Sequence, residues 1–189
     1  MGSEHFEWWV NAMRVLVAYE TGHGSTEDTA EEIGEVMRQA GAEVEVERCR
    51  KIEDVDGYDA YVLGSPIWAG KWLRPARAFI KKNKESLADR PTAIFMASGV
   101  AIDDDGRKMV VDRWLPGILS ELSPVEPVAI GNFAGVLNFP KYNIPTRLMM
   151  MAISKFSGGP TSGVHDFRDM EVIRDWARDT YSKISTQLE

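Results

Sequence analysis

The sequence predicts an α/β fold, in which a parallel sheet of five strands lies between two layers of helices. Short runs of β-forming apolar residues alternate with longer segments of helical periodicity, which indicates repeated strand–helix units. Small residues directly follow three of the strands, as expected where a strand turns into a helix at the carboxyl edge of a parallel sheet. We expect the strand order 2-1-3-4-5, one of the common orders of such sheets, which reverses between the first strand and the third.

The composition of the chain is that of an ordinary globular domain. Hydrophobic residues make up 44% of the 189 residues and charged residues 27%. The formal net charge of −7 argues against a nucleic-acid partner, for which a basic domain is expected. The single cysteine, Cys49, excludes an internal disulfide and a site in which several cysteines hold zinc or iron–sulfur, and it fits a reducing cytoplasm. No apolar run approaches the roughly 20 residues of a membrane span, so we expect a cytoplasmic protein.

The domain organisation follows from the first strand, which begins at Arg14. Residues 1–13 are expected to form an N-terminal extension that is partly vector-derived, in which Trp8 and Trp9 can pack on the domain edge or on another subunit. Residues 14–189 are expected to form one domain, with an insertion at about 131–167 before the last helix.

The first strand, residues 14–19, is followed by a loop of small residues. The loop holds two glycines, a histidine and three hydroxyl residues: Thr21, Gly22, His23, Gly24, Ser25 and Thr26. Acidic helical sequence begins at Glu27, so free backbone N–H groups and the positive end of a helix converge here. The sequence therefore predicts an anion site. The alternative is an ordinary strand-to-helix turn with Thr26 as the N-cap.

The elements that follow are a helix over 26–40 and a strand over 44–49. Four apolar residues at helical spacing give the helix one buried face: Ala30, Ile33, Val36 and Met37. Gly41 stands where a left-handed residue commonly ends a helix. Residues 44–49 alternate apolar and polar side chains, which is typical of a strand near a sheet edge.

The third strand begins at residues 60–63, and a second glycine-containing loop is expected at 64–70. A helix is predicted over 71–83, with Trp72 on its face, and the fourth strand over 92–97, ending in a third small-residue loop at 98–100. Because the first and third strands flank the point where the strand order reverses, the loops after them are expected to border one crevice.

The later elements are a helix over 106–122, bent or split by Pro116, a strand over 125–130 and a closing helix over 168–184. Val172 and Trp176, with Tyr181 or Ile184, are expected to face the sheet from the closing helix. Between 134 and 160 the chain has no acidic residue, and a short helix is expected there from a cap at Thr146 to Lys155.

The first loop resembles the flavodoxin phosphate loop, T-x-T-G-x-T. Thr21, Gly24 and Thr26 match this pattern, and His23 replaces the middle threonine. Residues 64–70, GSPIWAG, resemble the flavodoxin segment G-S-P-x-[YW]-x-G, which lies beside the flavin ring. The resemblance implies a flavodoxin-like three-layer sandwich that binds FMN. It implies these cofactor-binding residues: Thr21, Gly22, His23, Gly24, Ser25 and Thr26 for the phosphate, and Ser65, Pro66, Ile67, Trp68, Ala69, Gly70, Ser98, Gly99 and Val100 for the ring.

Two of these residues keep alternative interpretations. Trp68 can stack on a flavin or serve packing alone, and His23 can donate to a phosphate or lie solvated in a loop. No catalytic side chain and no metal ligand is assigned, because the flavin itself carries the electron chemistry.

The insertion resembles that of the menaquinone-dependent protoporphyrinogen dehydrogenase branch of the flavodoxin superfamily. The matching residues are Phe133, Ala134, Gly135, Asn138, Met149, Met150, Met151, Gly158, Gly159 and Thr161. The resemblance implies an oxidoreductase acting on a porphyrinogen-like or quinol-like substrate with a quinone, and the alternative is an electron carrier between protein partners. Residues 134–160 can receive a flat apolar substrate, touch the inner face of a membrane or dock a redox partner protein, or can simply form a second small core.

Overall fold

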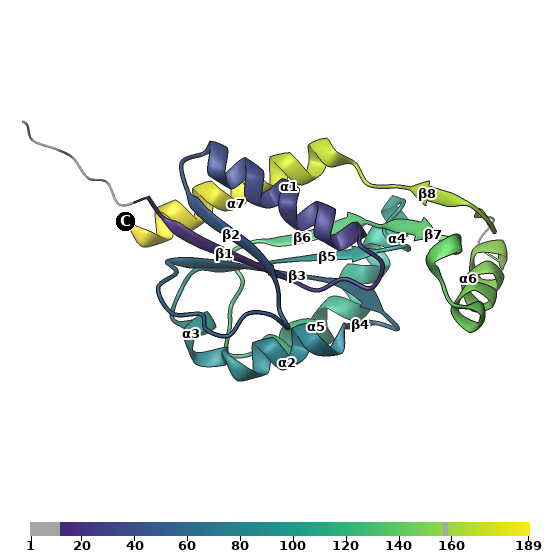
Figure 1. The fold of residues 1–189 in the computed structure, drawn as a ribbon, viewed down its shortest axis with the longest axis horizontal. Coiled ribbons are helices and arrows are strands. Elements are labelled where there is room, and N and C mark those ends of the chain that lie inside the picture. Colours follow the sequence, from purple (N-terminus) through teal and green to yellow (C-terminus); the bar gives the residue numbers. More distant parts are fainter. Residues whose placement is uncertain (1–11, 157–158) are drawn as a thin grey trace, which may run out of the picture.

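The computed structural model describes residues 12–156 and 159–189. The expected packing of Trp8 and Trp9, and Gly158 of the branch motif, lie outside these residues. A central sheet is covered by helices on both of its faces, and a small excursion extends from one end of the sheet (Figure 1). No helix within the described ranges is long and apolar enough to cross a membrane.

The central sheet confirms the predicted strand order. Its parallel strands lie in the order β2-β1-β3-β5-β6, and the short β4 pairs antiparallel with β3. The strands are β1 (Arg14–Tyr19), β2 (Glu43–Arg48), β3 (Ala60–Trp68), β4 (Lys71–Trp72), β5 (Thr92–Ser98) and β6 (Ile130–Ala134). With β4 left aside, this is the order 2-1-3-4-5.

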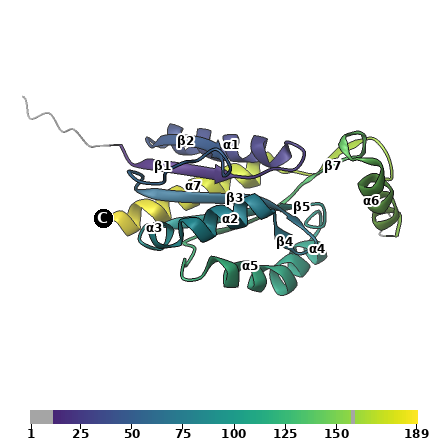
Figure 2. The same cartoon turned by 60° about the horizontal axis from the view of Figure 1, so that its bottom comes forward.

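The helices form two layers, one on each face of the sheet (Figures 1 and 2). One layer holds α1 (Ser25–Gln39) and α7 (Met170–Leu188). The other holds α2 (Arg74–Lys82), α3 (Lys84–Ala88), α4 (Asp104–Met109), the π-helical η1 (Val110–Trp114) and α5 (Leu115–Leu122). Alternate residues of β1 face the two layers: Val15 and Val17 belong to one core cluster, Leu16 and Ala18 to the other. This explains why β1 is apolar throughout.

The helix α1 confirms the predicted apolar face but corrects its start. Ala30, Ile33, Val36 and Met37 are all buried, and Gly41 follows the helix with a left-handed φ of 104°. The helix begins at Ser25, and Gly24 is the N-cap residue with φ 102° and no side-chain cap. The prediction of Thr26 as N-cap is therefore wrong, because the left-handed glycine already turns the chain into the helix.

The segment 64–70 is mostly strand, which corrects the predicted loop. β3 continues to Trp68 because Ser65 and Pro66 pair with Met96 and Ala97 of β5. A two-residue turn then leads into β4, so the helix expected over 71–83 begins only at Arg74 and Trp72 lies on a strand. Ala69 and Gly70 in that turn both have positive φ, 49° and 78°, as a tight hairpin of type I′ requires.

The last core strand lies later than predicted. A strand over 125–130 is wrong; β6 runs from Ile130 to Ala134. Pro127 lacks an N–H for the ladder, whereas the Phe133 ring packs on Phe95 and Trp176 at centroid distances of 6.3 and 5.5 Å. The excursion from the sheet therefore begins at Gly135, not at residue 131.

The two later helices confirm part of each prediction. The segment 106–122 is divided as expected, with η1 lying just before Pro116 and α5. α7 begins after Asp169, whose carboxylate accepts hydrogen bonds from the N–H groups of Glu171 and Val172. Val172 is exposed, so the prediction that it faces the sheet is wrong, whereas Trp176 packs on the core and Ile184 is buried as expected.

The excursion, residues 135–167, is called the insertion from here on. It contains β7 (Val136–Asn138), the 3₁₀ turn η2 (Phe139–Lys141), α6 (Ile144–Phe156) and β8 (Val164–Asp166), and β7 pairs antiparallel with β8. Figure 2 shows α6 standing apart from the sheet and its helices. The predicted cap at Thr146 is wrong, because the Asn143 side chain caps α6 by accepting from the Thr146 N–H at 3.0 Å.

Candidate functional site

The strand register brings three strand ends to the same edge of the sheet. Tyr19 pairs with Gly64, Pro66 with Ala97, and Ser98 with Ala134. The loops after β1, β3 and β5 therefore start beside one another, at the place where the strand order reverses. In open α/β sheets, ligands bind in the crevice at this point.

The start of the first loop is clamped by Glu20, a residue that sequence reasoning missed. Glu20 is fully buried, and its N–H donates to the Gly64 carbonyl at 2.9 Å. Its carboxylate accepts two hydrogen bonds from the Arg50 guanidinium, at 2.6 and 3.0 Å, and one from the Thr21 N–H at 3.1 Å. The signal in the sequence is a carboxylate directly after a buried apolar strand, where a charge requires a partner.

The hydroxyl groups of Thr21 and Thr26 lie inside the loop. Thr21 Oγ1 accepts from the Gly24 N–H at 2.9 Å, and both threonines are buried. The Gly24 carbonyl in turn accepts from the N–H groups of Glu27 and Asp28 at 3.0 and 3.3 Å. The exposed part of the first loop is therefore formed by Gly22 and His23, with Gly24 and Ser25 half-buried.

Backbone donors remain available on this exposed part. The N–H groups of Gly22, His23, Ser25 and Thr26 have no hydrogen-bond acceptor among residues 12–156 and 159–189. They surround the N-terminus of the fifteen-residue α1, where the peptide dipoles leave a partial positive charge. This arrangement can bind an anion such as a phosphate.

The acidic residues in the first turn of α1 are both paired with arginines. Glu27 binds Arg48 at 2.7 Å, and this arginine lowers the pKa of the Glu27 carboxyl. Asp28 binds Arg168 at 3.2 Å. These arginines reduce the repulsion that the two carboxylates would exert on an anion.

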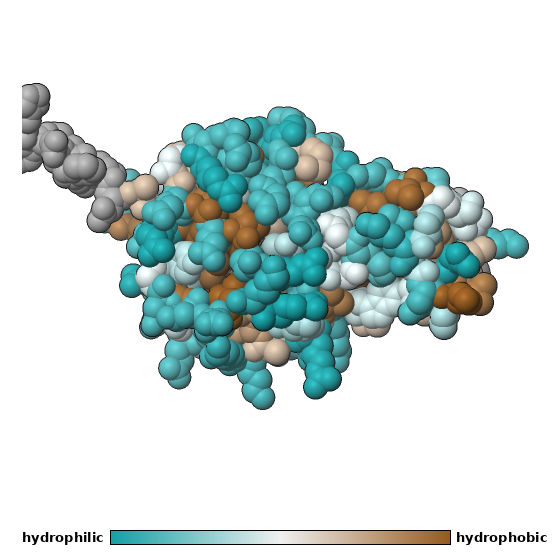
Figure 3. Space-filling model, viewed as in Figure 1, coloured by the Kyte–Doolittle hydropathy of each residue, from teal (hydrophilic) through white to brown (hydrophobic). Residues whose placement is uncertain are grey.

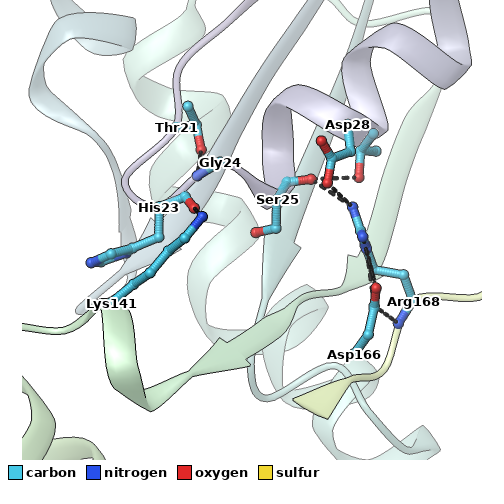
Figure 4. Close-up of polar contacts among 9 residues, drawn as sticks. Thr21, His23, Gly24, Ser25, Asp28, Lys141, Asp166 and Arg168 are labelled. Carbon is cyan, nitrogen blue, oxygen red and sulfur yellow. Dashed lines mark hydrogen bonds and ion pairs between the residues drawn. The ribbon is translucent and has the colours of Figure 1, made fainter. Parts of the chain in front are cut away.

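The insertion reaches back to the first loop through Lys141 and Tyr142. Lys141 Nζ donates to the His23 carbonyl at 3.3 Å (Figure 4). The Tyr142 ring meets the His23 ring edge-on at a centroid distance of 4.7 Å. Burial, and then the charge of Lys141, lower the pKa of His23. The sequence pattern does not connect Lys141 to the first loop, because the two lie more than a hundred residues apart along the chain.

Arg168 ties the other end of the insertion to α1. It donates to both carboxylate oxygens of Asp166 and, at 2.9 Å, to the Ser25 carbonyl. The arginine lowers the pKa of Asp166. A groove of about 240 Å³ lies between the first loop and the insertion, with Lys141 and Arg168 both in its lining. In Figure 4, Ser25 lies between these two cations.

The second loop region splits into a buried part and an exposed tip. Ser65 is fully buried, and its hydroxyl accepts from the Leu73 N–H at 3.0 Å, while Ile67 is buried and Pro66 half-buried. Trp68 has 44% of its surface exposed and Ala69 is also exposed. The surface that a ligand can touch is therefore the tip of the β3–β4 hairpin, residues 68–70. Ser65 acts inside the fold.

The third loop is shaped by Ser98. Its hydroxyl accepts from the Ala101 N–H at 3.1 Å, and its carbonyl from the Gly135 N–H at 2.9 Å. Gly99 is exposed and Val100 half-exposed. A side chain on Gly99 would come within 3.0 Å of Leu137, so the glycine allows the insertion to approach this loop closely.

Comparison with known proteins identifies one matching family and several similar proteins. The model of the family "Flavodoxin domain" matches residues 16–163. The chain is 28% identical over 166 residues to protoporphyrinogen IX dehydrogenase [quinone] of Escherichia coli strain K12, covering 87% of this chain and 89% of that protein. It is 28% identical over 171 residues to the protein of the same name from Leishmania major, covering 87% and 70%.

The fold also has solved counterparts. A flavodoxin from the domain Archaea superposes with a TM-score of 0.56 at 16% sequence identity, over 92% of this chain and 99% of that one. At this identity the likeness concerns the fold, and it confirms the predicted three-layer architecture.

Proposed function

The chain belongs to the flavodoxin domain family, and from this membership we propose that it is an FMN-binding oxidoreductase. Residues 14–189 form the FMN-binding domain in this proposal, with the phosphate at the first loop and the ring at the edge between β3 and β5. The observation that carries the proposal is the convergence of the three loops where the strand order reverses.

The first loop fits a phosphate group. Four backbone N–H groups without acceptors in the described structure surround the start of α1, and the Ser25 hydroxyl adds a further donor. A side chain built on Gly22 would meet nothing within 4 Å, so the space beside this residue is open to a ligand. Backbone donors at a helix N-terminus and open space beside them suit a phosphate.

The hairpin tip and the third loop fit a flat conjugated ring. Trp68 offers an exposed aromatic face, and Gly99 leaves the backbone of the third loop open. Gly70 lies against Trp114, since a Cβ on this glycine would come within 3.0 Å of the Trp114 ring. The Trp114 ring therefore supports the inner side of the hairpin tip, and the outer side of the tip stays exposed. When bound, FMN supplies the redox chemistry, because it can take two electrons from a reduced substrate and give them to a quinone.

We further propose that the substrate is porphyrinogen-like and the acceptor a quinone, as in the names of the two curated relatives. The insertion supports this choice. Apolar side chains on α6 are exposed, with Ile144 at 66%, Leu148 at 60% and Met149 at 45%. Figure 3 shows apolar side chains at the end of the molecule that α6 forms. A large, flat apolar molecule and a lipid-dissolved quinone both match such a surface.

The same surface supports a peripheral position at the inner face of a membrane. Residues 134–160 hold Lys141, Arg147 and Lys155 and no acidic residue, in a chain of net charge −7. Basic side chains beside an exposed apolar helix face favour an anionic lipid surface. This contact would bring α6 to the place where quinones are dissolved.

The substitution Leu148→Glu tests the enzymatic part of the proposal. We expect quinone-linked oxidation of a porphyrinogen to fall at least about tenfold, because a carboxylate on an apolar docking face costs more than about 1.4 kcal/mol. FMN content and reduction of a small water-soluble acceptor should stay unchanged. Val172→Glu is the matched control, since Val172 is an exposed apolar residue on α7.

An electron carrier between proteins is the outcome that would contradict this assignment. Such a carrier would show negligible turnover with porphyrinogen and quinone, both in the wild type and in Leu148→Glu. Equal loss of turnover in Leu148→Glu and Val172→Glu would contradict the role of α6.

A further inference from the structure

Lys141 belongs to the insertion but lies on the first loop. Its Nζ is 3.3 Å from the His23 carbonyl, and a Cβ built on Gly24 would lie 3.8 Å from it. The ammonium group therefore stands beside the exposed part of the loop, where Gly24 and Ser25 line the groove. Figure 4 shows the lysine side chain extended along His23 toward this point.

The charge of Lys141 has no acidic partner in the part of the chain that the structure describes. The two carboxylates that line the same groove, Asp28 and Asp166, are each paired with Arg168. The ammonium instead donates to a neutral carbonyl, which leaves most of its charge uncompensated. Burial, and then the charge of Lys141, lower the pKa of His23 on the same loop.

The position of Lys141 is held by the turn that carries it. The Lys141 N–H donates to the Asn138 side chain at 3.3 Å, and the Phe139 N–H to the Gly163 carbonyl at 3.1 Å. Phe139 is buried, and the Tyr142 hydroxyl accepts from the Asn138 N–H at 3.3 Å. These contacts fix the backbone of η2, so the lysine reaches the loop from a defined starting point.

We propose that Lys141 is a phosphate ligand that the insertion contributes to the cofactor site. Its ammonium binds an oxygen of the phosphate monoester that the N–H groups at the start of α1 hold. This inference rests on the proposed binding of FMN. A phosphate monoester carries a charge of about −1.5 to −2, whereas a helix end offers only about half a positive charge, so a cation is needed for balance.

The contact couples the cofactor to the insertion. If Lys141 binds the phosphate, FMN stabilises the contact between the insertion and the first loop. This contact then strengthens FMN binding by the same factor. Riboflavin lacks the phosphate and leaves the contact unchanged. The insertion is then ordered by the cofactor beside which it is proposed to act.

The test compares Lys141→Gln with Lys155→Gln, which removes an exposed lysine near the far end of α6. Dissociation constants for FMN and for riboflavin are measured on the full apoprotein by flavin fluorescence. For Lys141→Gln we expect FMN to bind about tenfold more weakly, as for the loss of one charge-assisted hydrogen bond, and riboflavin to bind as in the wild type. Lys155→Gln should match the wild type with both ligands, and Lys141→Arg should recover most of the FMN affinity.

Hydrogen exchange provides a second readout. FMN should slow exchange in the insertion of the wild type, and riboflavin should not; in Lys141→Gln the difference between the two should vanish. Equal weakening of FMN and riboflavin would show a packing role and overturn the inference, as would unchanged FMN binding. If wild-type protein binds no FMN at all, the proposed function itself is overturned, which is a distinct result.

Discussion

Hydroxyl side chains in or just after the strands at this edge of the sheet accept hydrogen bonds from their own chain. Thr21 and Ser98 each accept from the backbone N–H three residues further on, and Ser65 accepts from the N–H of Leu73, eight residues further on. Short hydroxyl side chains serve such local bonds as readily as they serve a ligand, and both uses look the same in a sequence. The residue types of the site could therefore be predicted, but which donors remain free could not. The free donors in the first loop are mainly backbone N–H groups.

The structure affects the protonation of His23. Burial, and then the charge of Lys141, hold its pKa below the ordinary value of 6.5. The folded protein therefore binds a proton here less readily than the unfolded chain does. His23 does not affect the free energy of unfolding above pH 6.5. This free energy falls as the pH drops below 6.5, because the unfolded chain takes up the proton more readily.

An NMR titration of the His23 imidazole measures this directly. We expect a midpoint below 6.5 in the wild type and a higher midpoint in Lys141→Gln, which removes the second cause of the shift. The shift should not vanish in that variant, because burial is the larger cause. A midpoint at or above 6.5 in the wild type would contradict the described contact between the loop and the insertion.

The hairpin joining β3 and β4 depends on its two left-handed residues. Gly70 has φ 78° and lies against the Trp114 ring, whereas Ala69 adopts φ 49° with an exposed side chain. Gly70→Ala should lower the free energy of unfolding by about 1–2 kcal/mol, because an alanine disfavours this φ and its Cβ crowds Trp114. Urea unfolding of the apoprotein measures the change.

Ala69→Gly is the matched control for that substitution. Glycine accepts the same φ without strain, so we expect no more than a few tenths of a kcal/mol of destabilisation. If both variants lost the same stability, the type I′ turn would not be the feature that holds the tip. In the proposed FMN site, this tip presents the exposed Trp68 to the flavin ring.

Two elements could not be placed from the sequence, for a shared reason. Residues 64–68 contain glycine and proline, which favour a turn, yet the neighbouring β5 extends β3 through Pro66. Residues 125–130 have the apolar pattern of a strand, yet β6 lies at 130–134, where Phe133 meets Phe95 and Trp176. In both cases, contacts between distant parts of the chain determine where the strand lies, and these contacts cannot be recognised from local sequence patterns.

At the scale of the whole molecule, the strand order and both helical layers were predictable. The helical layers follow from the local periodicity of the sequence, and the strand order is the one expected of a flavodoxin-like sheet. The position of the insertion beside the first loop was not predictable from the sequence. Its contacts with the first loop run through Lys141 and Tyr142, which lie more than a hundred residues from His23 along the chain. The site therefore combines a predictable sheet edge with an unpredicted partner.

The central claim is that FMN binds with its phosphate at the first loop, and Gly22→Asp tests it most directly. Gly22 is exposed and has nothing within 4 Å of its Cβ position, so the substitution adds a negative charge without disturbing the fold. Gly117→Asp is the control, because Gly117 is equally open and lies on α5, outside the three loops.

Titration of the apoprotein with FMN, followed by flavin fluorescence, is the measurement. We expect the wild type and Gly117→Asp to bind one FMN per chain with the same affinity. Gly22→Asp should bind FMN at least about tenfold more weakly, because a carboxylate then faces the phosphate. A wild type that takes up no FMN, or a Gly22→Asp variant that binds it as tightly as Gly117→Asp, would contradict the claim.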